Sequence, residues 1–125
     1  MAKDALKPLY WVGSALEELR TFPVDVRQQV GFALYLAQTG GRHMNAKPLR
    51  GFFGAGVLEM VENCDGNTYR AVYTVKFAGA VYALHAFQKK SKNGIRTPKS
   101  HLALVRERLR RAEEHHEALT RGRAR

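Results

Sequence analysis

The strongest constraint on the fold is a strand-rich stretch in the second half of the chain. Residues 68–77 alternate between two sides, Ala78-Gly79 interrupts them, and an almost uninterrupted apolar run follows from Ala80 to Phe87. β-Branched and aromatic residues around a short glycine-containing break are typical of a hairpin. A run that is apolar at nearly every position indicates a strand covered on both faces. We therefore expect the chain to fold around this pair of strands.

Cationic residues follow the apolar run directly, in the sequence Gln88-Lys89-Lys90-Ser91-Lys92. A buried strand that ends in lysines holds those cations in a fixed place at the sheet edge, which suggests an anionic partner. The formal charge of the 125-residue chain is +10. Such a field attracts polyanions, namely nucleic acid, the ribosome or an acidic protein. The alternative interpretation is that the charge serves solubility alone.

The loop of the hairpin decides which residues Arg70 meets. A two-residue turn at Ala78-Gly79 would pair residue 70 with Phe87 and place Arg70 on one face with His85 and Lys89. A three-residue loop with a left-handed Gly79 would shift the pairing by one residue and separate Arg70 from His85. Alanine tolerates a positive φ poorly, so the second loop is a serious rival. We expect Arg70 to lie near the lysines at the strand end and leave the place of His85 open.

The remaining pattern predicts an α+β protein with the element order β-α-α-β-β-β-α and an antiparallel sheet. Ser14 and Glu17 have the spacing of a capping box at the start of a first helix, and Asp65-Gly66 is a hairpin signal. The expected elements are a strand in 6–12, helices in 15–21 and from Pro23 to Gly40, a loop over 42–56, strands in 57–62, 68–77 and 80–87, and a helix from Pro98 to about Leu119.

Composition limits the classes of protein to consider. The length suits a single domain spanning 1–125, in which residues 120–125 are expected to form a frayed tail. A lone cysteine, Cys64, excludes an internal disulfide and a thiol-based metal cluster. The sequence contains neither a run of transmembrane length nor a signal-peptide core, so we expect a cytoplasmic protein without membrane attachment.

The chemistry that the residues offer is a cationic site without a metal or another cofactor. Metal-independent RNA cleavage needs a base for the 2′-hydroxyl, a cation for the charged phosphorane and an acid for the leaving oxygen. Arg70 suits the second task because a guanidinium can grip two phosphate oxygens. Lys89 and Lys90 could share that task or move a proton, and His85 titrates in the range for acid or base work. The candidate RNA-binding residues are Lys47, Arg50, Lys76, Lys92 and Arg96.

The other histidines carry less information. His43 and His101 are isolated in the sequence, and the adjacent His115 and His116 point to different sides of a helix. An adjacent pair of this kind makes a poor metal site. A core position on the buried strand is the competing interpretation for His85 itself.

Several segments together resemble the RelE/ParE superfamily of type II toxins, most closely its HigB-like, phage-derived branch. The resemblance covers about Leu6 to Ala112, and the phrase HAFQKKS followed by Thr97-Pro98 is its most specific part. The matching segments are KPLRG at 47–51, VLEMVE at 57–62, YRAVY at 69–73 and VYALHAFQKK at 81–90.

The resemblance implies a RelE-like fold, with an N-terminal helical hairpin and a C-terminal helix around a twisted antiparallel sheet. It also implies an mRNA interferase, that is, a ribosome-dependent endoribonuclease that inhibits translation. A cognate antitoxin, in this branch commonly of the helix-turn-helix type, would neutralise it. Arg70 matches the arginine of the family's central strand, and Lys90, with Lys89 beside it, matches the basic residue at the end of the next strand.

Two departures separate the chain from the best-studied relatives. Their strand before the hairpin carries catalytic lysines, whereas this strand carries Glu59 and Glu62, and the aromatic residue expected near the C-terminus is missing. Either the base is His85, a glutamate or a lysine, or the protein binds without efficient cleavage. Two alternatives follow: a ParE-like gyrase inhibitor that cuts nothing, and a plain RNA-binding module.

Overall fold

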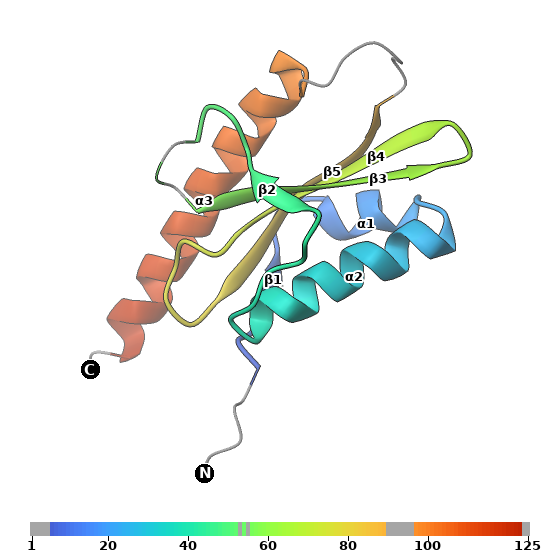
Figure 1. Cartoon of the computed structure of the whole chain (residues 1–125). Helices are drawn as coiled ribbons and strands as arrows, with labels where there is room; N and C mark the ends of the chain where they lie inside the picture. The colour runs from blue at the N-terminus through green and yellow to red at the C-terminus, as the bar shows by residue number, and fades with distance from the viewer. Residues whose placement is uncertain (1–5, 53, 55, 90–96, 124–125) are drawn as a thin grey trace.

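The computed structural model of the chain describes residues 6–52, 54, 56–89 and 97–123. Its elements follow the order β1 (Leu9–Trp11), α1 (Ala15–Arg20), α2 (Val24–Gln38), β2 (Ala46–Pro48), β3 (Val57–Cys64), β4 (Asn67–Thr74), β5 (Val81–Lys89) and α3 (Lys99–Arg123). The strands form one sheet in the order β1-β5-β4-β3-β2 (Figure 1). The α+β class and the two N-terminal helices followed by a C-terminal helix confirm the prediction.

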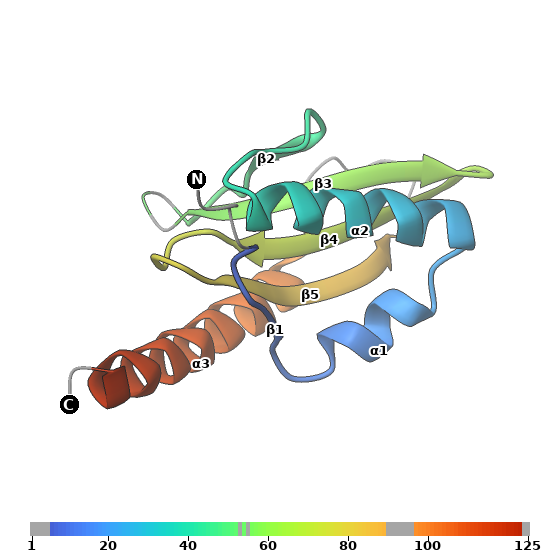
Figure 2. The ribbon, with the colours of Figure 1, turned by 90° about the horizontal axis from the view of Figure 1, so that it is seen from below.

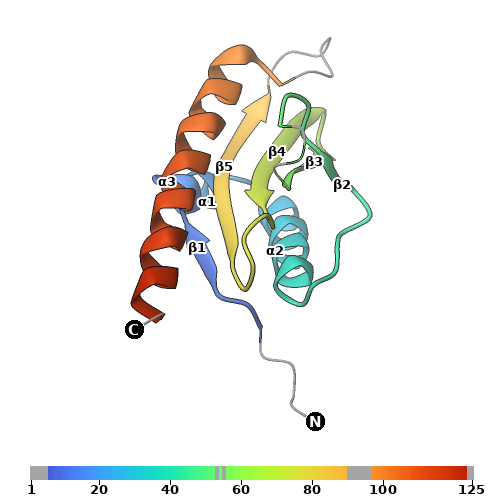
Figure 3. The same cartoon turned by 90° about the vertical axis from the view of Figure 1, so that its left-hand side faces the viewer.

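Helices cover both faces of this sheet. The α1–α2 pair packs on one face and α3 on the other (Figure 2). Leu19 of α1 and Val30 of α2 join Met60 in the first core, whereas Val105 of α3 joins Leu84 in the second. Strand β5 lies between β1 and β4, with α3 alongside it (Figure 3). A strand in this position is buried on both faces, which explains its nearly continuous apolar sequence.

Next to the loop that joins them, β4 and β5 pair in the shifted register. Beside the loop, Tyr73 pairs with Ala83, which is the pairing expected of the longer loop. Gly79 has a φ of +76°, a conformation that glycine adopts without steric cost. If this register continued along the strands, Arg70 and His85 would face opposite sides of the sheet.

A β-bulge then restores the other register. The pairing shifts between Val72 and Tyr73, so that Val72 pairs with His85 and Arg70 pairs with Phe87. One extra residue in a bulge turns every later side chain of its strand to the opposite face. Each of the two predicted registers is therefore correct on one side of the bulge, and Arg70 and His85 share a face.

The hairpin between β3 and β4 turns at Asp65-Gly66, the hairpin signal of the sequence, and its ladder reaches closer to the turn than predicted. Cys64 pairs with Asn67, and the two residues between them, Asp65 and Gly66, have φ values of 51° and 80°. Positive φ at both central positions is the conformation that matches the twist of the flanking strands.

The segment 42–56, predicted as a loop, contains the short edge strand β2. Lys47 pairs with Glu59 of β3, and Pro48 with Leu58. Because β2 is the last strand of the sheet, the missing N–H of Pro48 costs no ladder hydrogen bond. At the other edge, β1 pairs with β5 in parallel, so the sheet is mixed rather than fully antiparallel.

Two helix ends differ from the prediction. Ser14 is the residue before α1, but its side chain makes no capping hydrogen bond, so the capping box with Glu17 is wrong. Helix α3 begins at Lys99 and continues to Arg123, beyond the predicted end at Leu119. None of the described helices combines the length and the apolar character that crossing a bilayer requires.

Candidate functional site

Three neighbouring rows of residues cross the sheet on the face that α3 covers. The first row is Lys47, Glu59, Val72 and His85, the second is Val61, Arg70 and Phe87, and the third is Asn63, Thr68 and Lys89. Residues directly opposite each other in a ladder point to the same side of the sheet. The strand register therefore brings the sequence-predicted residues Arg70, His85 and Lys89 onto one surface, with Lys47 at its edge.

Arg70 is held by an acidic residue of the neighbouring strand. Its Nη1 lies 2.9 Å from Oε1 of Glu59, and both side chains are buried. The other carboxylate oxygen of Glu59 accepts a hydrogen bond of 2.6 Å from the Thr97 hydroxyl, just before α3 begins. An Arg–Glu pair of this kind is costly to bury unless further hydrogen bonds satisfy it. The contact from Thr97 ties the start of α3 to β3.

The cationic end of β5 is described only in part. Lys89 is the last residue of β5 and is buried. The predicted residues Lys90, Lys92 and Arg96 lie outside the described residues. Within the described chain, no group of three potential metal ligands comes together.

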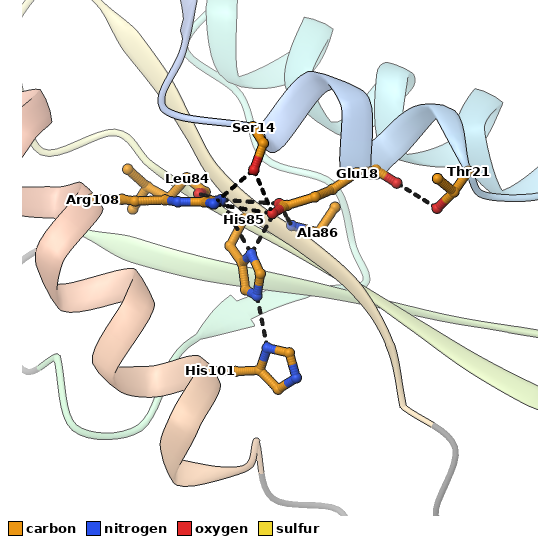
Figure 4. A network of polar contacts seen from close by, with 8 residues as sticks. All are labelled: Ser14, Glu18, Thr21, Leu84, His85, Ala86, His101 and Arg108. Carbon is orange, nitrogen blue, oxygen red and sulfur yellow. Dashed lines mark hydrogen bonds and ion pairs between the residues drawn. The ribbon is translucent and has the colours of Figure 1, made fainter.

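A second acidic residue, Glu18 of α1, bridges α1, β5 and α3. Its two carboxylate oxygens each lie 3.0 Å from a different terminal nitrogen of Arg108 (Figure 4). Oε1 also accepts the N–H of Ala86 at 3.1 Å, and Oε2 accepts the hydroxyl of Ser14 at 3.0 Å. This is why Ser14 caps no helix: its hydroxyl is engaged with the carboxylate and accepts a hydrogen bond from Arg108 as well.

His85 connects this carboxylate to a residue at the start of α3. Its Nδ1 lies 2.9 Å from Oε1 of Glu18, and its Nε2 lies 2.7 Å from Nδ1 of His101 (Figure 4). The His101 ring stacks on Phe87, with centroids 3.8 Å apart and an interplanar angle of 10°. Phe87 is the cross-strand partner of Arg70. His101 therefore lies over the surface that carries Arg70 and is not the isolated residue that the sequence indicated.

The environment sets the charge of each member of this chain of contacts. Burial alone would raise the pKa of Glu18, but the hydrogen bonds from Arg108 and from the Ala86 N–H hold that pKa below its ordinary value. Burial lowers the pKa of His85, although the carboxylate of Glu18 acts in the opposite direction. Burial lowers the pKa of His101 in the same way. At neutral pH the arrangement is therefore an ionised carboxylate beside two neutral imidazoles.

Two predicted RNA-binding residues lie at the other end of the sheet. Lys76 lies in the loop between β4 and β5, 3.3 Å from a carboxylate oxygen of Glu113. Arg50 lines an open pocket of about 770 Å³ between the end of α2 and the segment that joins β2 to β3. Lys47, by contrast, is exposed on β2 directly opposite Glu59. The structure thus groups Lys47 with the Arg70 surface and separates Lys76 and Arg50 from it.

Three residues of the network around His85 were not predicted as functional, and the sequence contains only a weak signal for them. Glu18, His101 and Arg108 are distant in sequence, and each has the appearance of an ordinary helix residue. Arg108 falls among other arginines of α3, yet it is buried, with one guanidinium nitrogen donating to the Leu84 carbonyl at 2.9 Å. Its place three residues after Val105, on the apolar stripe of α3, was the one available indication.

Comparisons with known proteins agree with this fold. No curated protein shows a significant match. Among solved structures, a mutant of E. coli toxin RelE in the free state superposes with a TM-score of 0.55 at 20% identity, covering 86% of this chain and 98% of that chain. The fold is therefore RelE-like, as predicted. The family model for phage-derived Gp49-like proteins (DUF891) matches residues 17–110, which is most of the chain. The chain belongs to this Gp49-like family.

Proposed function

We propose that this chain is the toxin of a type II toxin–antitoxin pair, in the HigB-like branch of the RelE/ParE superfamily. It stops translation in the cytoplasm by cutting mRNA on the ribosome. The phage-derived family, the fold shared with toxin RelE and the formal charge of +10 support this function. A chain with this charge is attracted to RNA over long distances, and the ribosome offers RNA at high density.

The observation that carries the proposal is the grouping of Arg70, His85 and Lys89 in successive rows of one sheet face. Arg70 would stabilise the negative charge that develops on the phosphorane, because a guanidinium donates to two phosphate oxygens at once. Lys89 and Lys90 would add to that field. The chemistry needs no metal or other cofactor.

RNA would extend from this surface along the neighbouring cations. Lys47, exposed at the edge of the same face, would contact the RNA backbone. Lys92 and Arg96, which follow β5 in the sequence, belong to the same proposed contact. Arg50 and Lys76 would reach RNA only where it continues toward the opposite end of the sheet.

The partner that this surface needs between rounds of activity is an antitoxin. A cationic site of this kind is neutralised most directly by an acidic segment that covers it. We propose a helix-turn-helix antitoxin as the cognate partner. Stable co-purification of the two proteins is the expected result, and a freely expressed, harmless chain would contradict it.

One observation favours a non-nucleolytic, gyrase-binding function of the ParE type. The guanidinium of Arg70 is buried against Glu59, on the strand where the best-studied relatives carry lysines. In this second function growth arrest would come with DNA-damage signalling and without loss of mRNA. A plain RNA-binding module would cause no arrest.

The test compares induced expression of the wild type, Arg70→Lys and the control Arg110→Lys, with mapping of mRNA 5′ ends. Lysine at position 70 keeps a positive charge beside Glu59 but cannot grip two oxygens, so cleavage should fall about 10²–10³-fold. Arg110 lies exposed on α3, 2.9 Å from Glu114, and its variant should cut like the wild type. Antitoxin binding verifies that each variant is folded. Growth arrest without new 5′ ends in the wild type would favour the gyrase-binding function.

A further inference from the structure

The contacts around Glu18 leave little freedom in where the protons of His85 lie. A carboxylate only accepts hydrogen bonds, and Nδ1 of His85 lies 2.9 Å from it. Nη1 of Arg108 is 3.3 Å from the same ring nitrogen. However, both protons of that Nη1 are engaged, one with Glu18 at 3.0 Å and one with the Leu84 carbonyl at 2.9 Å. The proton between Glu18 and His85 therefore belongs to Nδ1 of His85.

The tautomer of His101 follows from that of His85. A neutral imidazole that carries its proton on Nδ1 has a lone pair on Nε2. Nε2 of His85 lies 2.7 Å from Nδ1 of His101, so Nδ1 of His101 must donate. The second nitrogen of His101, Nε2, is then the atom with the unshared electron pair. Because burial keeps both rings neutral at pH 7, this arrangement is the one present under working conditions.

His101 places the lone pair of its Nε2 on the sheet face that carries Arg70. His85 is buried, whereas Glu18 and His101 are both half-buried, so the buried ring connects the carboxylate to a second ring that solvent can reach. The His101 ring is fixed by stacking on Phe87, which lies directly opposite Arg70. His101 and Arg70, the proposed phosphate-binding cation, are thus both neighbours of Phe87 on the same sheet face.

We propose that His101 is the general base of the RNA cleavage, and that Glu18 and His85 are positioning residues that fix its tautomer. This inference rests on the proposed function. Nε2 of His101 takes the proton of a ribose 2′-hydroxyl, and the 2′ oxygen attacks the adjacent phosphorus. The P–O5′ bond breaks, the leaving 5′ oxygen takes a proton from water, and a 2′,3′-cyclic phosphate remains. The imidazolium then returns its proton to the solvent.

The cleavage test uses programmed ribosomes and the variants His101→Asn and His115→Asn. The asparagine amide can still donate to Nε2 of His85, so the variant keeps the network but loses the base. His115 provides the matched control, since it lies farther along α3 and its Nδ1 is likewise hydrogen-bonded, 2.7 Å from the Tyr82 hydroxyl. His101→Asn should slow cleavage about 10²–10⁴-fold, whereas His115→Asn should cleave like the wild type.

The pH profile separates a base from a merely structural residue. The wild-type rate should rise with pH as His101 loses its proton, and His101→Asn should lack this rise. Among the described residues, His85 contacts His101 directly, Glu18 and Arg108 contact the His85 ring, and Arg70 lies opposite Phe87. Because the carboxylate of Glu18 raises the pKa of His101, Glu18→Gln should move the rise to lower pH.

Three outcomes are distinguishable. Wild-type cleavage that survives in His101→Asn would overturn the base assignment and leave the proposed function standing. A wild type that cuts no mRNA would overturn the proposed function, and the base with it. Independently of activity, ¹⁵N NMR of the histidine rings should show a proton on Nδ1 of both His85 and His101, and a proton on Nε2 of neutral His101 would refute the inference.

Discussion

Glu18 and Arg108 face one another across β5, and each oxygen of the carboxylate lies 3.0 Å from a separate guanidinium nitrogen. The two residues come from opposite sides of the sheet, one from α1 and one from α3. They meet at the bulge, where the Leu84 carbonyl and the Ala86 N–H each take part in the contact. This pair connects the two helical layers through the strand between them.

Removal of Arg108 should destabilise the fold strongly. Arg108→Ala leaves the carboxylate of Glu18 partly buried without its cation, a change that costs about 3 kcal/mol in comparable buried pairs. We expect the free energy of unfolding, measured in urea, to fall by about this amount.

The control for this measurement is Arg110→Ala. Arg110 forms an exposed pair with Glu114 one turn along the same helix, and pairs of this kind contribute about 0.3–0.5 kcal/mol. Equal losses in the two variants would mean that the Glu18–Arg108 pair adds nothing beyond helix propensity.

Acidification should destabilise the protein in two stages. The pKa values of His85 and His101 are lowered from 6.5, so the unfolded chain binds their protons first. Their contribution is complete above pH 6.5 and is lost as the pH falls through the folded-state values. The pKa of Glu18 is lowered from 4.5, so its contribution is lost below that pH. Each proton adds a slope of at most about 1.4 kcal/mol per pH unit.

Unfolding measured in urea between pH 8 and pH 3 checks this prediction. In His101→Asn the free energy of unfolding should fall less steeply in the first stage, because only His85 is left to titrate. The asparagine amide still donates to the His85 ring, so the environment of His85 is kept. If the first stage lowers the free energy of unfolding as much in His101→Asn as in the wild type, His101 does not contribute to it and the prediction is contradicted.

The hairpin shows how far local sequence reasoning reaches. Period-two alternation and Gly79 were sufficient to predict both strands and the two possible registers. The sequence could not indicate that both occur, because the bulge at Leu84 is an insertion that no turn residue marks. Its cause lies in tertiary contacts, since the Leu84 carbonyl accepts from Arg108 on α3 and the Ala86 N–H donates to Glu18 on α1.

The residues of the candidate site fall into the same two groups: those placed by local sequence and those placed by tertiary contacts. Arg70 and Lys89 could be predicted because they belong to one continuous hairpin whose ladder places them. His101 could not, because its importance depends on contacts with His85 and Phe87 that form only when α3 packs on the sheet. Residues that act through the packing of separate elements leave little pattern in a single sequence.

The ion pair between Arg70 and Glu59 predicts a gain of RNA affinity. Glu59→Gln removes a negative charge 2.9 Å from the guanidinium, so the surface attracts phosphate more strongly. We expect tighter binding of single-stranded RNA, by up to about tenfold or 1.4 kcal/mol. The fold should become less stable, because buried Arg70 loses its ion pair with Glu59.

Glu62→Gln is the matched control for this gain. It makes the same change of net charge on the same strand, but Glu62 pairs with Tyr69, in a row that faces α1 and α2. Equal gains in both variants would assign the effect to net charge and not to the Arg70 surface.

The position of Lys47 predicts a local effect on the salt dependence of RNA binding. Lys47 is exposed opposite Glu59 on the face with Arg70, whereas Lys76 lies in the β4–β5 loop, paired with Glu113. Each phosphate contact to a single strand contributes about 0.7 to the slope of log K against log salt. Lys47→Ala should therefore reduce the slope by about that amount, and Lys76→Ala should leave it unchanged.

Titration of a short single-stranded RNA at several salt concentrations measures both slopes. Loss of slope in Lys76→Ala alone would place the RNA at the loop end of the sheet, away from Arg70 and His101.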